Sequence, residues 1–185
     1  MTERHTEEFS VLQTLVMNKY SVFAAVVAVS LAKPITWKDD SHSAKSCPIP
    51  YRPVADRCLM FDTFHKVTWH DARDFCHGYL SELAQIDSAD LLKAVVDFIH
   101  DEGMAGHDFW IGANDEEQEG VWKWPDGSDV HMGTPFWGYW TSPSRQEPSG
   151  GTTSNYCCMV SEYFYYFFDC WGTDKRSPLC EYRQQ

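Results

Sequence analysis

The sequence FWIGANDEEQEGVWKW, residues 109–124, decides the fold of this chain. Its first four residues form a compact apolar run, which is typical of a strand. Residues 121–124 alternate in character and end at the turn signal PDG, residues 125–127, so a second strand is expected there. Residues 126–155 are rich in Gly, Pro, Ser and Thr. A segment of this length without regular structure is usually a functional loop.

Two amphipathic helices are expected before this segment. Residues 68–71 (TWHD) have a capping pattern, and apolar residues then recur at spacings of three and four as far as residue 80. Asp87 or Ser88 caps a second helix that ends near Gly103. Further strands are expected at residues 59–61, within residues 156–170 and at residues 178–182. This order predicts an α+β fold in which two helices pack on antiparallel sheets.

Composition excludes several classes of function. The 185 residues carry a formal net charge of −12, which repels phosphate backbones, so no nucleic acid partner is expected. The sequence has no nucleophile elbow, phosphate loop or paired-carboxylate motif, so an enzyme is not expected. The eight histidines are scattered without a His-x-x-x-His pair, which favours structural or surface roles over zinc binding.

The N-terminal region is interpreted as a secretion signal. Residues 20–32 form an apolar run that a helix would extend over about 20 Å, short of a membrane core. Residues 1–32 are therefore taken as an N-terminal extension and signal peptide, with Met17 as the better start, and residues 33–46 as a linker. A secreted protein without a membrane span is expected, and the competing interpretation is a type II membrane anchor.

The cysteines point to an oxidising compartment. There are seven, widely spaced and without a Cys-x-x-Cys pair, a pattern that predicts a disulfide framework in an exported protein. Because the number is odd, at least one thiol is left over or pairs between two chains.

Residues 110–113 (WIGA) and 119–124 (EGVWKW) resemble the central signature of the C-type lectin family. Cys76 on the first helix and Cys180 in the sequence LCE stand where the family has its cysteines, and the resemblance covers residues 47–183. It implies a C-type lectin-like domain over that range, with a disulfide-stapled fold and a long irregular ligand-binding loop. The implied function is recognition of sugars outside the cell.

The resemblance also implies how the cysteines pair. The implied bridges are Cys47–Cys58, Cys76–Cys180 and Cys157–Cys170. Family spacing from Glu147 selects Cys157 rather than Cys158. Cys158 is then the odd thiol, either a small buried hydrophobe or a bridge that makes a homodimer.

Sugar-binding members of the family hold Ca²⁺ on the long loop, and the resemblance implies a counterpart here. Its ligands would be Glu147, Ser149, Asn155 and Asp169, with Pro148 in the cis form by analogy. The match departs from the family pattern, since Ser149 replaces an amide and no Asn stands beside Asp169. An auxiliary calcium site would use Asp115 and Glu119, whose family partners fall on Gly150 and Tyr156, which lack carboxylates.

Two functions follow from this pattern. The first is Ca²⁺-dependent binding of microbial or cell-surface glycans, as in innate immunity, with Trp137 and Trp140 either stacking on the sugar or packing the loop. The alternative is a calcium-independent module that contacts a protein or a mineral surface through the aromatic loop.

Overall fold

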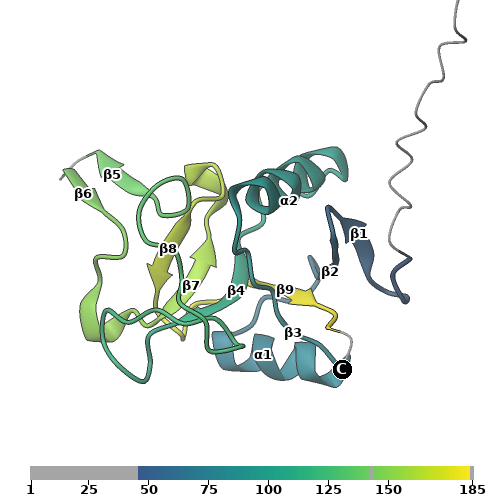
Figure 1. Ribbon diagram of the computed structural model, residues 1–185, viewed down its shortest axis with the longest axis horizontal. Coiled ribbons are helices and arrows are strands. Elements are labelled where there is room, and N and C mark those ends of the chain that lie inside the picture. Colours follow the sequence, from purple (N-terminus) through teal and green to yellow (C-terminus); the bar gives the residue numbers. More distant parts are fainter. Residues whose placement is uncertain (1–45, 142–143, 184–185) are drawn as a thin grey trace, which may run out of the picture. The chain divides into compact units, whose positions relative to one another are not determined.

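The computed structural model describes residues 46–141 and 144–183, and Figure 1 shows their arrangement. The predicted signal peptide and nearly all of the predicted linker lie outside the described residues. Within the described range, no helix is both long and apolar enough to cross a membrane.

One seven-stranded sheet organises the domain, with the strand order β1-β2-β9-β4-β7-β8 and with β3 paired to β9. Neighbouring strands are antiparallel except β4 and β9, which run parallel. The strands are β1 (Arg52–Val54), β2 (Arg57–Phe61), β3 (Glu82–Leu83), β4 (Phe109–Asn114), β7 (Tyr156–Met159), β8 (Phe167–Cys170) and β9 (Ser177–Glu181).

Both predicted helices are confirmed, with the predicted caps. Helix α1 (Trp69–Gly78) begins at Thr68, whose hydroxyl accepts a hydrogen bond of 3.2 Å from the amide of Asp71. Helix α2 (Ala89–Asp101) begins at Ser88, whose hydroxyl accepts a 3.2 Å hydrogen bond from the amide of Leu91. Each cap satisfies an amide that has no partner inside its helix, which fixes where the helix starts.

The two helices cover opposite faces of the sheet, and the core is divided accordingly. Figure 1 shows α1 and α2 on either side of β4 and β9. Alternate strand residues face opposite sides, so Leu59, Ile111 and Leu179 pack in the cluster that contains the buried face of α2. Met60 and Trp110 pack in the other cluster, with the buried face of α1. The α+β class and the lectin-like arrangement predicted from the sequence are confirmed.

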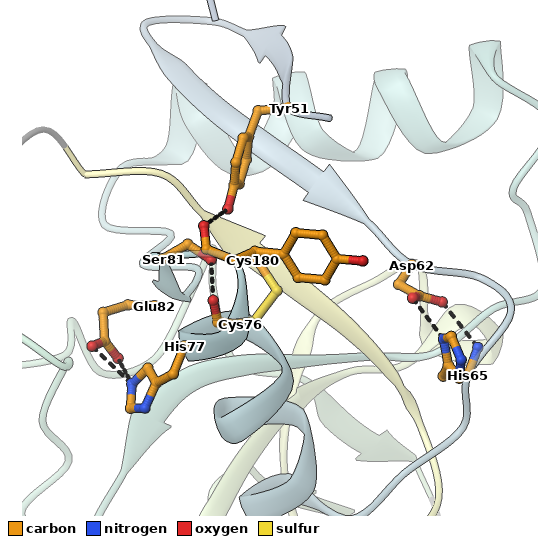
Figure 2. Close-up of a disulfide and its surroundings, with 9 residues drawn as sticks. Tyr51, Asp62, His65, Cys76, His77, Ser81, Glu82 and Cys180 are labelled. Carbon is orange, nitrogen blue, oxygen red and sulfur yellow. Dashed lines mark hydrogen bonds and ion pairs between the residues drawn. A yellow bond between two sulfur atoms is a disulfide. The ribbon is translucent and has the colours of Figure 1, made fainter. Parts of the chain in front are cut away.

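Three disulfides join these layers. Cys76–Cys180 links α1 to β9, and Cys47–Cys58 ties the start of the described chain to β2, both as predicted. Figure 2 shows the surroundings of the Cys76–Cys180 bridge, where the Ser81 hydroxyl donates to the Cys76 carbonyl at 2.8 Å. The hydroxyl of Tyr51 donates to the carbonyl of Tyr79 at 2.9 Å, so the end of α1 is held by side chains as well as by sulfur.

The predicted third bridge was wrong, because the structure joins Cys158, not Cys157, to Cys170. On strand β7 the two cysteines point to opposite faces of the sheet. Cys158 and Cys170 belong to the cluster on the α1 side, whereas Cys157 is buried as a free thiol on the α2 side. Neither is therefore available for an intermolecular bridge, so the predicted homodimer through Cys158 is also wrong.

Within residues 109–124, one predicted strand is absent from the structure. Residues 121–124 do not form a strand, and Lys123 makes only isolated bridges with Asn114 and Asp129. Trp122 and Trp124 are nevertheless buried, so their alternation reflects core packing. Gly112 is required where β4 passes its neighbours, because a Cβ there would lie 2.8 Å from the carbonyl oxygen of Leu83.

The predicted long loop contains short pieces of regular structure. A small hairpin of β5 (Tyr139–Thr141) and β6 (Ser144–Gln146) is followed by a 3-10 turn, η1 (Gly151–Thr153). The amide of Gly138 donates to the carbonyl of Phe167 at 2.9 Å, which anchors the loop to β8. A second 3-10 turn, η2 (Ser161–Tyr163), lies between β7 and β8.

Candidate functional site

A pocket of about 520 Å³ opens between the long loop and the end of β8, and we call it the long-loop pocket. The loop supplies one wall through Trp140, Arg145, Glu147, Ser149 and Gly150. The opposite wall comes from the β8 end and the segments beside it, through Tyr163, Phe168, Asp169 and Trp171. The pocket thus combines two carboxylates with aromatic rings, a composition typical of a ligand site.

Glu147 lies at the loop side of this pocket and is only 2% exposed. One of its carboxylate oxygens, Oε1, accepts hydrogen bonds from the indole N–H of Trp140 and, at 2.6 Å, from the hydroxyl of Ser149. Both donors belong to the loop itself. Because a buried carboxylate needs partners, these bonds hold the loop in the shape that forms the pocket wall.

Asp169 on β8 reaches across to the same loop. Its Oδ2 accepts a 2.6 Å hydrogen bond from the amide of Ser149 and another from the amide of Gly150. A Cβ at Gly150 would lie 3.0 Å from Asp169 Oδ2 and 2.4 Å from the hydroxyl oxygen of Ser154. Glycine at this position therefore allows the carboxylate to approach the backbone.

The two carboxyl groups lie close enough to affect each other. The pKa of Asp169 is raised to about 7, mainly by burial and also by the hydrogen bond and the negative charge of Glu147, while the two backbone amides act in the opposite direction. A hydrogen bond between two carboxyl groups requires one proton, so the pair holds a proton that an isolated aspartate would lose well below neutral pH.

Asn155 takes a different place from the one predicted. Its amide N–H donates to Oδ1 of the buried Asp115 at 3.1 Å, and Asn155 does not line the long-loop pocket. The other oxygen of Asp115 accepts from the amide of Gly120 at 2.8 Å. Of the four predicted calcium ligands, the structure brings together Glu147, Ser149 and Asp169.

The auxiliary pair, Asp115 and Glu119, is also close in space. Desolvation raises the pKa of Glu119, and the charges of Asp115 and Asp169 raise it further. The carboxylate oxygens of Asp115 are already occupied by protein donors, which leaves Glu119 as the exposed acid of this pair. The side chains therefore form a short line of negative charge that leads from the auxiliary position toward the long-loop pocket.

The two tryptophans predicted to contact a ligand lie in different environments. Trp137 is 1% exposed, packs edge-on against Trp122 at 4.9 Å between ring centroids, and donates its indole N–H to the carbonyl of His131. It belongs to the core and cannot contact a ligand, so its prediction as a binding residue was wrong. Trp140 lines the pocket, with its ring 4.9 Å from that of Tyr163.

Sequence reasoning missed Trp171, which lines the pocket and is 59% exposed. Its position directly after Cys170 was the available signal, because the residue that follows a bridged cysteine at the end of an edge strand is held in place while its side chain stays free.

The oxygen ligands that the structure brings together do not fit the predicted calcium ion. Ca²⁺ takes six to eight oxygen ligands. The predicted ligands that meet here are the Ser149 hydroxyl and two carboxylates, and each carboxylate has one oxygen that already accepts two hydrogen bonds. The amide of Asn155 is turned to Asp115. Among the residues that the structure describes, no group of three or more His, Cys, Asp or Glu side chains is arranged to hold a metal.

Comparison with known proteins identifies the family. The family model described as the Lectin C-type domain matches residues 65–181. The chain belongs to the C-type lectin domain family. Members of this family are generally binding modules rather than enzymes. The C-type lectin domain is similar to a "C-type lectin mannose-binding isoform" of Oxyuranus scutellatus, with 32% identity over 117 residues, which is 60% of this chain and 66% of that protein.

Two solved structures share the fold of this C-type lectin domain. The carbohydrate-recognition domain of the mouse scavenger receptor C-type lectin has a TM-score of 0.60 and 23% identity, and covers 76% of this chain and 100% of its own. A calcium-independent type II antifreeze protein has a TM-score of 0.59 and 19% identity, over 76% of this chain and 96% of its own. The chain spans between 22% and 66% of the length of the curated relatives that it matches.

Proposed function

We propose that this C-type lectin domain binds glycans in the long-loop pocket by direct hydrogen bonds and ring stacking. The observation that carries the proposal is an open pocket lined by two neighbouring carboxyl groups and by an exposed indole ring. Sugar hydroxyls are hydrogen-bond donors that carboxylates accept, and the C–H face of a sugar ring packs on an aromatic face. Glu147 and Asp169 are the acceptors in this proposal, and Trp171 is the stacking platform.

Calcium is not required in this proposal. The sequence favoured Ca²⁺-dependent binding, but the predicted ligands that meet in the pocket provide fewer oxygen atoms than the ion needs. Glu147 and Asp169 instead keep acceptor capacity for a ligand, because each has one oxygen that accepts no hydrogen bond from the loop, and a ligand donor can replace the proton that the two carboxyl groups share.

A second candidate is a calcium-independent module for a protein or mineral surface, the alternative that the sequence left open. Two observations favour it. A calcium-independent antifreeze protein has the same fold. Beside the pocket, Phe164 is 80% exposed, and Tyr166 and Trp171 are exposed as well. In this case the exposed aromatic side chains would be the contact, and Glu147 would matter only for the shape of the loop.

The place of action that we propose is outside the cell. Three disulfides bridge the domain, and such bonds persist in oxidising compartments. The predicted secretion signal at residues 20–32 agrees with this location. Glycans of microbial or host cell surfaces are then the accessible ligands.

Affinity chromatography of the oxidised domain on mannose, galactose and amino-sugar matrices tests the proposal. We expect retention on at least one matrix with equal strength in calcium and in EDTA. Glu147→Gln should weaken retention, whereas Glu117→Gln, which removes the same charge outside the pocket, should not. Release by EDTA would restore the calcium mechanism. Failure to bind any sugar, with intact folding, would favour the protein- or mineral-binding module.

A further inference from the structure

The long-loop pocket has an excess of negative charge that its own residues do not balance. Seven charged side chains line it, five acidic and two basic. Within the described residues, neither Glu147 nor Asp169 forms an ion pair. The acidic residues are Asp108, Glu147, Glu162, Asp169 and Asp174, and the basic residues are Arg145 and Arg176.

Arg176 does not compensate the two central carboxylates. Its guanidinium lies 3.0 Å from Oδ2 of Asp174 and 4.0 Å from Oδ2 of Asp108. The guanidinium also lies 5.1 Å from the ring centroid of Trp110, in a cation–π position. Arg176 thus forms ion pairs with Asp108 and Asp174, and it does not neutralise the negative charge beside Glu147.

Aromatic rings enclose the region around these carboxylates. The ring of Trp140 is 4.9 Å from that of Tyr163 and 5.4 Å from that of Phe168, so the two walls meet through aromatic contacts. Trp171 stands exposed at the same pocket. Carboxylates combined with aromatic faces favour an organic cation, because the ring faces carry partial negative charge and attract ammonium groups.

We infer that the long-loop pocket selects glycans that carry a free, protonated amine, such as de-N-acetylated amino sugars. This inference rests on the proposed glycan-binding function and names its ligand class. An ammonium group has three N–H donors and therefore needs about three acceptors, against the six to eight ligands of Ca²⁺. If the ammonium group replaces the proton shared by Glu147 and Asp169, the oxygen of each carboxylate that accepts nothing from the loop and the hydroxyl oxygen of Ser149 match that smaller demand.

The same arrangement discriminates against other sugars. An N-acetylated sugar has no positive charge, so it would leave the proton between Glu147 and Asp169 in place and would gain no charge–charge attraction. A sulfated or carboxylated sugar would add a further negative charge to the pocket, at a cost that grows as water is displaced. The expected order of affinity is therefore amine, then neutral sugar, then acidic sugar.

Isothermal titration in EDTA with two matched tetrasaccharides tests the inference. One is the glucosamine tetramer and the other is the N-acetylglucosamine tetramer, which differ only in the charged amines. We expect the glucosamine tetramer to bind at least tenfold more tightly. Glu147→Gln and, independently, Asp169→Asn should each reduce this preference to less than threefold. Thermal unfolding checks that each variant is folded.

Controls separate the pocket from general attraction to a negative protein. Glu117→Gln removes one negative charge, as Glu147→Gln does, but outside the pocket. This variant should keep the preference for the glucosamine tetramer. Trp171→Ala should weaken both tetramers. Trilysine should bind more weakly than the glucosamine tetramer, and equal binding would overturn the assignment to a glycan.

The outcomes for the inference and for the proposed function differ. If both tetramers bind equally, or if only the N-acetylated one binds, the inference fails and glycan binding stands. If neither tetramer binds while a mannose or galactose matrix retains the domain, the inference again fails alone. If no sugar binds the folded domain, the proposed function fails together with the inference.

Discussion

Replacement of Cys157 and Cys158 one at a time tests the arrangement of the sheet faces. The two neighbours are both fully buried, yet only Cys158 is bridged, to Cys170 twelve positions later. Cys157→Ala removes one buried sulfur atom, which should lower the free energy of unfolding by about 1 kcal/mol. Cys158→Ala removes a similar atom and also opens the crosslink.

The loss from the crosslink can be worked out from the length of the loop that it closes. The chain-entropy relation for a loop of this size gives about 3 kcal/mol, in addition to the packing loss. Cys158→Ala should therefore destabilise the domain by about 3 kcal/mol more than Cys157→Ala does. That is a large fraction of a typical domain stability of about 5–15 kcal/mol.

Urea denaturation under non-reducing conditions measures the difference, and thiol titration of the unfolded protein provides an independent count. The wild type should show one free thiol, Cys157→Ala none, and Cys158→Ala two. A larger loss in Cys157→Ala, or no free thiol in Cys158→Ala, would refute the assignment and restore the pairing that family spacing suggested.

Three further predictions follow from the same structure. Replacing both Cys76 and Cys180 with alanine opens a loop of 104 residues and should cost about 5 kcal/mol, seen as a larger shift in urea midpoint than for the Cys158–Cys170 pair; equal shifts would contradict the loop argument. Because the pKa of Asp169 is raised to about 7, the folded state binds the proton more tightly than the unfolded state does, so the free energy of unfolding should fall as pH rises from about 4 to 7. After allowance for the partial exposure of this carboxyl, which faces Glu147 and Glu119, the fall is about 1–2 kcal/mol, and Asp169→Asn should remove it; an unchanged pH profile in that variant would refute the assignment. Trp137→Ala should destabilise by about 3–5 kcal/mol and Trp171→Ala by less than about 0.5 kcal/mol, as thermal unfolding would reveal, and the reverse order would contradict the assigned core and surface positions.

Local signals predicted the two helices and several strands, among them β2, β4 and β9. The hydroxyls of Thr68 and Ser88 cap their helices by accepting hydrogen bonds from amides three residues later in the chain. Because both partners are local in sequence, the sequence is enough to predict where each helix begins. The strand expected at residues 121–124 was wrong because the alternation of Trp122 and Trp124 arises from burial in the core, which sequence alone does not distinguish from pairing with a neighbour.

The choice between Cys157 and Cys158 depended on the sheet. A strand turns successive side chains to opposite faces, so pairing with Cys170 is decided by the face and not by the distance along the chain. Family spacing carried no information about that face. The known alternation of strands would have been the better guide.

The sequence predicted the candidate site only in part. Glu147, Ser149 and Asp169 meet, as the family resemblance implied, because the hydroxyl and the amide of Ser149 bind the two carboxyl groups. The prediction that Asn155 is a calcium ligand failed because its hydrogen-bond partner, Asp115, lies 40 residues earlier in the chain. The two side chains meet only in the folded domain. Trp171 belonged to no family motif, and its position directly after Cys170 was the one signal that could have suggested an exposed side chain beside the pocket.

The most direct test of the central claim observes the tryptophan indole N–H signals by NMR during titration with the glucosamine tetramer. Trp140 donates to Glu147 inside the pocket and Trp171 lines it, whereas Trp122 and Trp137 pack together in the core. The account predicts that the signals of Trp140 and Trp171 shift and saturate while those of Trp122 and Trp137 stay in place. Saturable binding that moves the core indoles and leaves Trp140 and Trp171 unchanged would contradict it.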